Sequence, residues 1–490
     1  MNYRILSRLL GVITAALGAA FLLSLCVSLY YMGADPREEL AMRGFGLSAV
    51  AAILLSAFFH YKGRNAVRRL FGKEALATIG LGWLLATIVG ALPYILIARV
   101  GPHDAIFESA SGLTTTGASI FSDVEALPRS LLFWRSLSQW IGGLGVVVFF
   151  VAILSFLGAG AKILFSRESS AQAADLGSER VQTGVSRIMG LYMAISLACM
   201  LAYLAAGMSV YDAVTHMLAT ISTGGFSTYN ASMAHFANPL IEWICILFMA
   251  LGGTSFVLIL KVIQREPRAI SQNSELKVYY AILAAATLVC IVFNFGHEHF
   301  DGIHELVRHS AFQVVSIMTT TGFATRDFDQ WMPVLHAVLL ALMVIGGSSG
   351  STSGGSKVVR LVTALRYVAQ LVERSYRGNV VRSIRVNGAP MSQQACEDSN
   401  GFLVMVALVA AAGTMTVALF EPNMSFEGCV SASFACLFNI GPGFAELGPM
   451  RNFSELSAAS KFFLSLLMIM GRVELFAILA LFSPQVWKKY

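Results

Sequence analysis

The sequence predicts an all-α polytopic membrane protein, and three observations lead to this prediction. Of its 490 residues, 56% are hydrophobic and only 13% are charged, whereas an ordinary soluble domain carries about 25% charged residues. Apolar windows long enough to cross about 30 Å of hydrocarbon, roughly 20 residues each, recur along the whole chain, and no soluble domain fits between them. The net charge of +6 follows from basic loops on one side of the bilayer and needs no nucleic-acid partner.

Ten candidate spans can be counted, and the eighth is long and interrupted. They lie near residues 6–32, 44–60, 75–98, 131–157, 186–208, 240–263, 277–296, 332–368, 401–420 and 458–483. The first is too long, and too plainly followed by others, for a cleaved signal peptide. An even number of spans puts both termini on one side.

Basic residues indicate which side that is, because short cytoplasmic loops carry the excess of Lys and Arg. One set of loops is rich in them, for example around Arg68, Arg167, Arg265 and Arg374, whereas residues 207–242 contain none. Both termini and the basic loops are therefore expected in the cytoplasm.

Four segments of the chain resemble one another. SASGLTTTGAS ends near Gly117, MLATISTGGFS near Gly224, SIMTTTGFAT near Gly322 and ACLFNIGPGF near Gly441. Each follows an amphiphilic stretch of about three helical turns and lies between two spans, and each following span has a glycine in its middle. The pattern predicts one unit of span, half-helix, polar loop and span, used four times around one axis, after two extra N-terminal spans.

The loops have the chemistry of a cation path. Non-helical backbone at membrane depth is tolerated only where protein buries it or where it lines a water-filled cavity. Thr and Ser supply oxygen ligands, and Gly permits positive φ, so that rings of carbonyl oxygens can replace the hydration shell of a cation. The half-helices would direct C-terminal ends, each with about half a negative elementary charge, at the same path.

These motifs resemble the membrane subunit of the Trk/Ktr/HKT superfamily of potassium transporters over about residues 70–485, and the two extra spans resemble its bacterial Trk type. In this family one chain holds four covalently joined M1-P-M2 pore units in pseudo-fourfold arrangement. The resemblance implies an N-terminal helix pair (1–70) and pore repeats at 71–165, 166–268, 269–390 and 391–490, the third with an interrupted second helix and a cytoplasmic segment.

The resemblance also implies the residues of a selectivity filter. They are Thr115, Thr116, Gly117, Ser222, Thr223, Gly224, Thr320, Thr321, Gly322, Asn439, Ile440 and Gly441. The fourth set departs from Thr-Gly, as fourth repeats of this type commonly do. In plant relatives a serine in place of the first filter glycine goes with sodium transport. All four are glycine here, so the implied ion is K+, with rubidium tolerated.

A candidate gate interrupts the eighth span. The segment IGGSSGSTSGGSK, residues 345–357, has too little apolar surface for a continuous lipid-facing helix. It resembles the family's intramembrane loop below the filter, which obstructs the pore, and its glycines are Gly346, Gly347, Gly350, Gly354 and Gly355. A phosphate-binding P-loop is disfavoured because Val358 follows Lys357, so the required Gly-Lys-Ser/Thr is absent.

Arg472 lies in the middle of the last span, where a cation costs about 2.5 to 3.5 kcal/mol even on lenient scales. Glu474, two residues further on, cannot face it on a helix. One interpretation is an arginine paired with a carboxylate or with carbonyls at a helix contact. The family implies a barrier in the pore just inside the filter, acting with the interrupting loop.

The outer connections carry other candidate groups. His297, His299, His304 and His309 crowd one connection and could suggest zinc, but no companion Cys or regular ligand spacing supports it. The seven cysteines show no ligand spacing either. The acidic residues of the outer connections, Glu108 and Glu305 among them, would make the outer mouth mildly cation-attracting.

The Arg-rich segment 366–388 is either a simple positive-inside loop or a docking surface. Its length favours docking, as does a hairpin-like pattern with turns at Gly378 and Asn387. The resemblance implies a ring of cytosolic nucleotide-binding regulatory subunits of TrkA type, a homodimer, and the bacterial inner membrane. Nothing in this chain binds nucleotide by motif.

Two other function classes compete with potassium transport. A secondary transporter with broken helices and a midplane site is possible, but four Gly-terminated loops entering from one side count against inverted repeats. A membrane enzyme would need a nucleophile with its base, or a metal cluster, within the spans, and the sequence offers neither. The sequence leaves open whether flux is channel-like or coupled to protons or sodium, and which nucleotide regulates the partner.

Overall fold

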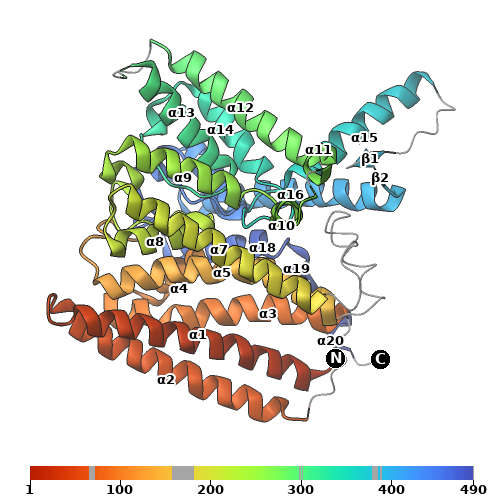
Figure 1. Cartoon of the computed structure of the whole chain (residues 1–490). Helices are drawn as coiled ribbons and strands as arrows, with labels where there is room; N and C mark the ends of the chain where they lie inside the picture. Colours follow the sequence, from red (N-terminus) through yellow and green to blue (C-terminus); the bar gives the residue numbers. More distant parts are fainter. Residues whose placement is uncertain are drawn as a thin grey trace.

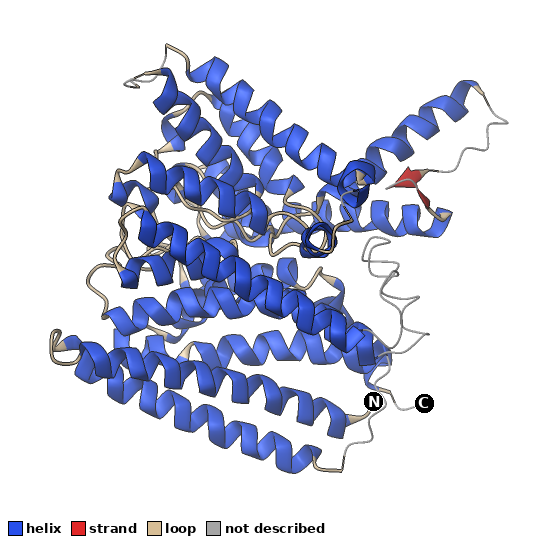
Figure 2. Cartoon of the chain, viewed as in Figure 1, coloured by secondary structure: helices blue, strands red, loops and turns tan. Residues whose placement is uncertain are grey.

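The computed structural model describes residues 1–65, 72–156, 181–266, 268–296, 300, 302–377, 384–386 and 389–488. This part of the chain is almost entirely helical (Figure 2), which confirms the all-α class. Its strands form one antiparallel pair, β1 (Arg385–Val386) and β2 (Ala389–Pro390). The pair brackets the turn predicted at Asn387, which itself lies outside the described residues, as does Gly378.

The chain begins with two long antiparallel helices, α1 (Tyr3–Tyr31) and α2 (Arg37–Gly63), which pack along their whole length (Figure 1). A small residue at Gly18 allows this close approach, since a side chain there would press on Ala52 and Ile53. These are the two extra N-terminal helices that the sequence predicts.

The rest of the chain repeats one arrangement of three helical parts. The first helices are α3 (Gly72–Gly90, prolonged by the π-helical turn η1, Tyr94–Ala98), α7 (Val181–Ala205), α12 (Ser274–Asn294) and α16 (Gln393–Phe420). The half-helices are α4 (Pro102–Leu113), α8 (Val210–Ile221), α13 (Ile303–Met318) and α17 (Phe426–Leu437). The second helices begin with α5 (Arg129–Phe156), α9 (Pro239–Gly252), α14 (Pro333–Ile345) and α18 (Ala458–Arg472).

Short elements complete the fold. They are α10 (Phe256–Ile263), α11 (Arg268–Gln272), α15 (Val358–Tyr376), α19 (Phe476–Leu481), α20 (Pro484–Trp487) and the 3-10 turns η3 (Ser232–Phe236), η4 (Phe328–Gln330) and η5 (Ala445–Leu447). Contacts between each second helix and the half-helix of the next repeat close the four units into a ring: α5 with α8, α9 with α13, α14 with α17, and α18 with α4.

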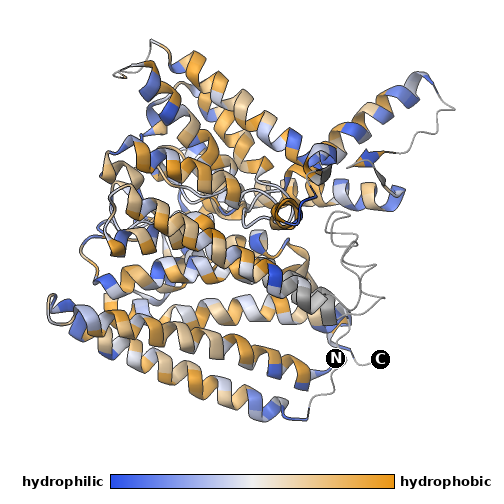
Figure 3. Cartoon of the chain, in the orientation of Figure 1, coloured by the Kyte–Doolittle hydropathy of each residue, from blue (hydrophilic) through white to orange (hydrophobic). Residues whose placement is uncertain are grey.

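Several helices suit a bilayer. Among the described residues, six are long and apolar enough to cross a membrane, and the bent pair α9–α10 makes a seventh. Figure 3 shows apolar residues along the outer helices α1, α2 and α12, with hydrophilic residues at many helix ends and on α15. Each of the ten predicted spans contains described helix, although residues 346–357 of the eighth are a loop and the tenth is broken at residues 473–475.

The second helices are more broken than the sequence predicts. Only the eighth span was expected to be interrupted. However, α9 and α10 meet at a bend of 98° just after Gly252, and α18 ends at Arg472 because Glu474 and Leu475 both adopt positive φ, 58° and 61°. Arg472 therefore lies in the middle of the predicted span, at the point where that span is divided into α18 and α19.

Both termini lie at one end of the molecule (Figure 1). The amino group of Met1 approaches the carbonyl oxygen of Lys488 at 3.5 Å, and Lys73 Nζ donates to the same oxygen at 3.0 Å. The half-helices lie toward the opposite end, so the chain agrees with an even number of crossings.

Candidate functional site

The four half-helices end in the same backbone motif. Just beyond each helix end one residue is left-handed: Thr115 (φ 56°), Thr223 (53°), Thr320 (58°) and Asn439 (57°). The amide of the following residue donates to the carbonyl five residues back, as from Thr116 to Ser111 at 2.9 Å and from Ile440 to Ala435 at 2.9 Å. This is the Schellman motif, whose left-handed position is usually glycine. A residue with a Cβ costs about 1 to 2 kcal/mol there, so its use in all four copies indicates a role for the side chain.

The four loops interlock through glycines two residues later. These glycines are Gly117, Gly225, Gly322 and Gly441, with φ of 86°, 80°, 80° and 105°. A Cβ on any of them would lie less than 3.0 Å from a carbonyl oxygen of the next loop, namely that of Gly224, Thr321, Ile440 and Thr116 in turn. The contacts run from the first loop to the second, third and fourth and back to the first. We call residues 114–117, 222–225, 319–322 and 438–441 the ring loops.

The second ring loop requires a correction of register. The comparison of the four repeats in the sequence matched Gly224 with Gly117, with Ser222 and Thr223 before it. In the structure Gly225 has the positive φ and approaches the next loop, and Thr223 is the left-handed residue. Ser222 is the helix cap, and its hydroxyl donates back to the carbonyl of Leu218 at 2.7 Å. The backbone counterparts of Thr115, Thr116 and Gly117 are therefore residues 223–225.

Neutral oxygen atoms dominate the ring. The hydroxyls of Thr114 and Thr116 lie 2.7 Å apart, and the equivalent pair in the third loop, Thr319 and Thr321, repeats this distance. Thr115 Oγ1 is buried without a hydrogen-bond partner among the described residues. Buried carbonyl and hydroxyl oxygens without a charged side chain suit a monovalent cation that exchanges water for oxygen dipoles.

A second loop lies directly against the inner side of the ring. Residues 346–357, which we call the inner loop, join α14 to α15. Thr352 Oγ1 donates to the carbonyls of Ile221 (3.0 Å) and Gly252 (3.1 Å), and the amide of Gly354 donates to Thr320 Oγ1 at 2.6 Å. The amide of Gly355 donates to the carbonyl of Phe438 at 3.1 Å. The inner loop thus contacts the second, third and fourth ring loops or the helix ends that carry them.

The glycines predicted as a gate shape this loop. Gly346, Gly350 and Gly355 have φ of 71°, 76° and 73°, and the backbones of Gly346 and Gly355 touch at the neck of the loop. Gly354 lies against Phe438, and a side chain at Gly347 would strike Ser353. Gly346, Gly347, Gly354 and Gly355 thus lie near the two ends of the loop, whereas Gly350 lies against Ser255 at the start of α10.

Arg472 joins the inner loop to the first repeat. It is buried, NH1 donates to the carbonyl of Thr352 at 2.7 Å, and NH2 approaches the carbonyl of Gly142 at 3.4 Å. Its Nε has no partner among the described residues. Glu474 pairs instead with Arg360 at 2.8 Å. The arginine is therefore held by carbonyls, as one interpretation expected, and these carbonyls belong to the inner loop and to α5.

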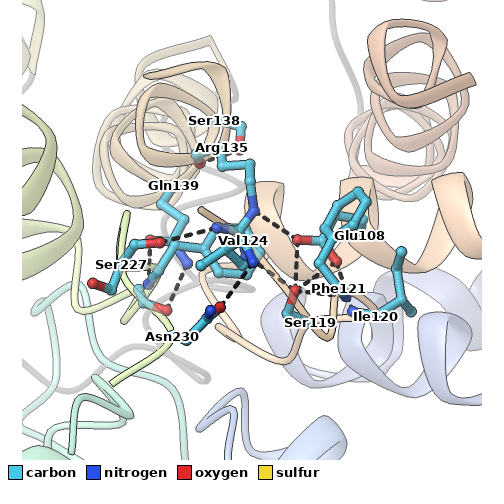
Figure 4. Close-up of polar contacts among 12 residues, drawn as sticks. Glu108, Ser119, Ile120, Phe121, Val124, Arg135, Ser138, Gln139, Ser227 and Asn230 are labelled. Atoms are coloured by element: carbon cyan, nitrogen blue, oxygen red, sulfur yellow. Dashed lines mark hydrogen bonds and ion pairs between the residues drawn. The ribbon is translucent and has the colours of Figure 1, made fainter. Parts of the chain in front are cut away.

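A buried ion pair between Arg135 and Glu108, which we call the brace, supports the segments that follow the first and second ring loops (Figure 4). Arg135 on α5 donates through Nε to Glu108 Oε1 at 2.8 Å, and both side chains are almost completely buried. The same guanidinium donates to Ser119 Oγ and to the carbonyl of Ser227, each at 3.0 Å. It joins the segment after the first ring loop to the segment after the second.

Sequence reasoning missed this brace. The expectation that Glu108 lines the outer mouth was wrong, because it pairs inside the protein. The sequence signal for the ion pair was Arg135, a charged residue in the apolar window LLFWRSLSQW, since a lone buried charge requires a partner.

The histidine-rich connection is built around carboxylates. His309 is buried with Nε2 3.4 Å from Glu305 Oε1, and the neighbouring Arg308 pairs with Glu242 at 2.7 Å. Glu305 also pairs with Arg326. His297 and His299 lie outside the described residues, within which no group of three or more potential ligands is arranged to hold a metal.

Comparisons with known proteins place the chain in a family. Residues 74–489 match the TrkH family, described as a cation transport protein. The chain is 30% identical to the Trk system potassium uptake protein TrkH of Salmonella typhimurium and 31% identical to that of Halomonas elongata, with 100% of both chains covered in each case. It is 28% identical to TrkG of Escherichia coli, over 99% of each chain.

A solved structure agrees with this result. The crystal structure of the potassium transporter TrkH from Vibrio parahaemolyticus matches with a TM-score of 0.89 and 29% identity over 100% of both chains. The protein is a cation transporter and not an enzyme. The chain belongs to the TrkH family, as the resemblance in its sequence predicts.

Proposed function

We propose that this protein takes potassium into a bacterial cell as the membrane subunit of a Trk-type system, with the ring as its selectivity filter. The observation that carries the proposal is the closed set of backbone contacts in which each ring glycine lies against a carbonyl of the next loop. Four chemically similar loops around one axis give rings of oxygen dipoles of fixed size. The names of the relatives above agree with potassium as the ion, and rubidium is the expected substitute.

The proposed ligands are the backbone and hydroxyl oxygens of the ring loops. They come from Thr115, Thr116, Gly117, Thr223, Gly224, Gly225, Thr320, Thr321, Gly322, Asn439, Ile440 and Gly441. The half-helices end at the ring, so their C-terminal dipoles favour a cation there. K+ is the cargo of this site.

The proposed gate is the inner loop together with Arg472. The loop bonds to the helix ends and left-handed residues below the ring, and a positive charge is tied across it to Gly142. A cation leaving the ring inward would meet both the backbone of the loop and the guanidinium. Movement of the loop would carry Thr352 away and release Arg472.

The protein would lie in the inner membrane with both termini in the cytoplasm, and the proposed partners act from that side. The helix α15 projects from the body of the protein at the end where the termini lie (Figure 1). Its apolar residues Leu365, Val368, Val372 and Tyr376 are 54 to 68% exposed, and Arg366, Arg374 and Arg377 accompany them. Such a face supports docking, either to a cytosolic TrkA-type nucleotide-binding subunit or to a second copy in a homodimer.

Ion flux tests both parts of the proposal. The full chain is reconstituted in proteoliposomes, and the fluxes of potassium, rubidium and sodium are compared for the wild type, Gly322→Ser and Arg472→Ala. The wild type should pass potassium and rubidium over sodium. Gly322→Ser should admit sodium, because a Cβ there strikes the carbonyl of Ile440, and Arg472→Ala should raise the flux.

The opposite results separate filter from gate. If Gly322→Ser keeps full selectivity, the ring is not the filter. If Arg472→Ala has the same selectivity as the wild type and conducts no faster, the arginine is not a barrier. A protein that passes no monovalent cation, with or without a cytosolic partner and nucleotide, would point to a transporter of another substrate.

A further inference from the structure

A buried glutamine is hydrogen-bonded to the second ring loop. Gln139 lies on α5, three residues before Gly142, and is fully buried. Its Nε2 donates to the carbonyl oxygen of Gly224 at 2.6 Å, and its Oε1 accepts from the amide of Phe226 at 3.0 Å. Figure 4 shows this side chain one helical turn from Arg135. Its two bonds hold the peptide groups on both sides of Gly225.

The same side chain fills the space of a missing one. A Cβ on Gly224 would lie within 3.0 Å of Cδ, Oε1 and Cβ of Gln139. Gly224 is not among the residues with positive φ, so its backbone does not itself require glycine. The other ring loops carry Thr116, Thr321 and Ile440 at this position. The nearest obstacle to a side chain at 224 is therefore Gln139.

The second helices of other repeats carry methionine instead of this glutamine. Gly142, Gly252 and Gly471 correspond because each lies against a carbonyl at the end of its own half-helix, that of Leu113, Ile221 or Leu437. Three residues earlier on α9 and α18 lie Met249 and Met468, both fully buried. Methionine has nearly the shape of glutamine but no amide. The first repeat thus has a side-chain amide, that of Gln139, where α9 and α18 have a methionine. This amide faces the second ring loop, which has no side chain at position 224.

We propose that Gln139 is a positioning residue for the filter, fixing the carbonyl of Gly224 and so helping to set the selectivity for potassium over sodium. The inference rests on the proposed function. Glycine has more backbone freedom than any other residue, so residues 224 and 225 together form the loosest part of the ring. The amide of Gln139 restrains the peptide groups that a side chain at 224 would otherwise restrain by packing. Arg135 adds a third bond on the same helix face, to Ser227.

A double-mutant cycle tests this role. The variants are Gln139→Met, Gly224→Thr and the combination, which copies the pair Met249 and Thr321. Gln139→Met should lower selectivity for potassium over sodium about tenfold, the equivalent of about 1.4 kcal/mol, because two buried polar groups lose their partner. Gly224→Thr should lower it further, since the new side chain strikes Gln139. The combination should return selectivity to within about threefold of the wild type, because a methionine is not tied to the loop by hydrogen bonds and its flexible side chain can turn away from the new threonine.

Controls separate positioning from packing. Gln313→Met removes another buried glutamine, whose amide donates to the carbonyl of Arg326 in the outer connection, and it should leave selectivity unchanged. Thermal unfolding of each variant in detergent reports on folding. Unchanged selectivity in Gln139→Met, or single effects that simply add in the combination, would overturn the inference, and so would a combination that fails to fold. A wild type without selectivity would refute the proposed function instead.

Discussion

The ring loops and the inner loop are both rich in glycine, but they need it for different reasons. Each ring glycine lies against the backbone of a neighbouring loop, so a side chain there collides with a group that cannot move independently. The inner loop needs glycine mainly for its own path, since Gly346 and Gly355 meet at its neck. The inner loop is held to its neighbours by hydrogen bonds, from the side chains of Thr352 and Arg472 and from backbone amides such as that of Gly355.

Under the proposed function, this difference would make the ring the stiffer of the two and the inner loop the part that moves. The ring is fixed by helix caps, by its own closure and by the buried brace behind it. The inner loop rests on the ring through a few hydrogen bonds, each worth only about 0.5 to 1.5 kcal/mol net. A structure that selects should be stiff, and one that gates should be released at modest cost, so substitutions in the two regions should have different effects.

The largest effect is expected at the ring. Gly225→Ala puts a Cβ within 3.0 Å of the carbonyl of Thr321 at a φ of 80°, which combines overpacking of about 1 to 3 kcal/mol with left-handed strain. Potassium-selective flux should be lost. Gly145→Ala is the control, since nothing lies within 4 Å of a Cβ on this α5 residue, and it should keep wild-type flux. Wild-type selectivity in Gly225→Ala would contradict the stiff ring.

The buried brace should affect stability next. Arg135→Met leaves Glu108 buried without its cation, which should reduce the free energy of unfolding by about 3 to 5 kcal/mol. Thermal unfolding in detergent measures this. The double variant Arg135→Met with Glu108→Gln should recover part of the loss because no unpaired charge remains. Equal stability of single and double variants would show that the pair does not brace the ring.

The inner loop should respond by opening. Thr352→Val keeps the shape of the side chain but removes its bonds to Ile221 and Gly252, so the flux should rise several-fold while selectivity stays unchanged. Thr363→Val is the matched control, because that hydroxyl only bonds back to Val359 within α15. A loss of selectivity in Thr352→Val would mean that the two loops do not act separately.

The smallest effect is expected in the turn between α1 and α2. The hydrogen bond from Arg37 lowers the pKa of Asp35 below 3.8. Its stabilisation is therefore present above that pH and is lost as the pH falls through the folded-state pKa. Arg37 is half exposed, so the pair contributes about 0.2 to 1 kcal/mol. Asp35→Asn should lower the melting temperature only slightly at pH 7, and the difference should shrink as the pH falls through the folded-state pKa of Asp35.

Much of this architecture could be predicted from sequence, because membrane spans and repeated polar motifs are local patterns. The four loops and the interruption between α14 and α15 are of this kind. The register of the second loop was misread because STGGF offers two adjacent glycines, although the Gly-Phe pair that it shares with TTTGF pointed to Gly225. The break after Gly252 and the positive φ of Glu474 also depend on packing with the inner loop and Arg360. The roles of Arg135 and Gln139 arise between repeats distant in sequence.

The most direct test of the central claim is the position of the ion itself. Crystals of the full chain grown in rubidium would give an anomalous difference map. The account predicts a rubidium peak on the ring axis, between the loops that contain Gly117, Gly225, Gly322 and Gly441. The peak should be absent from control crystals grown in sodium. Rubidium bound elsewhere, with none at the ring, would contradict the claim that these four loops select the ion.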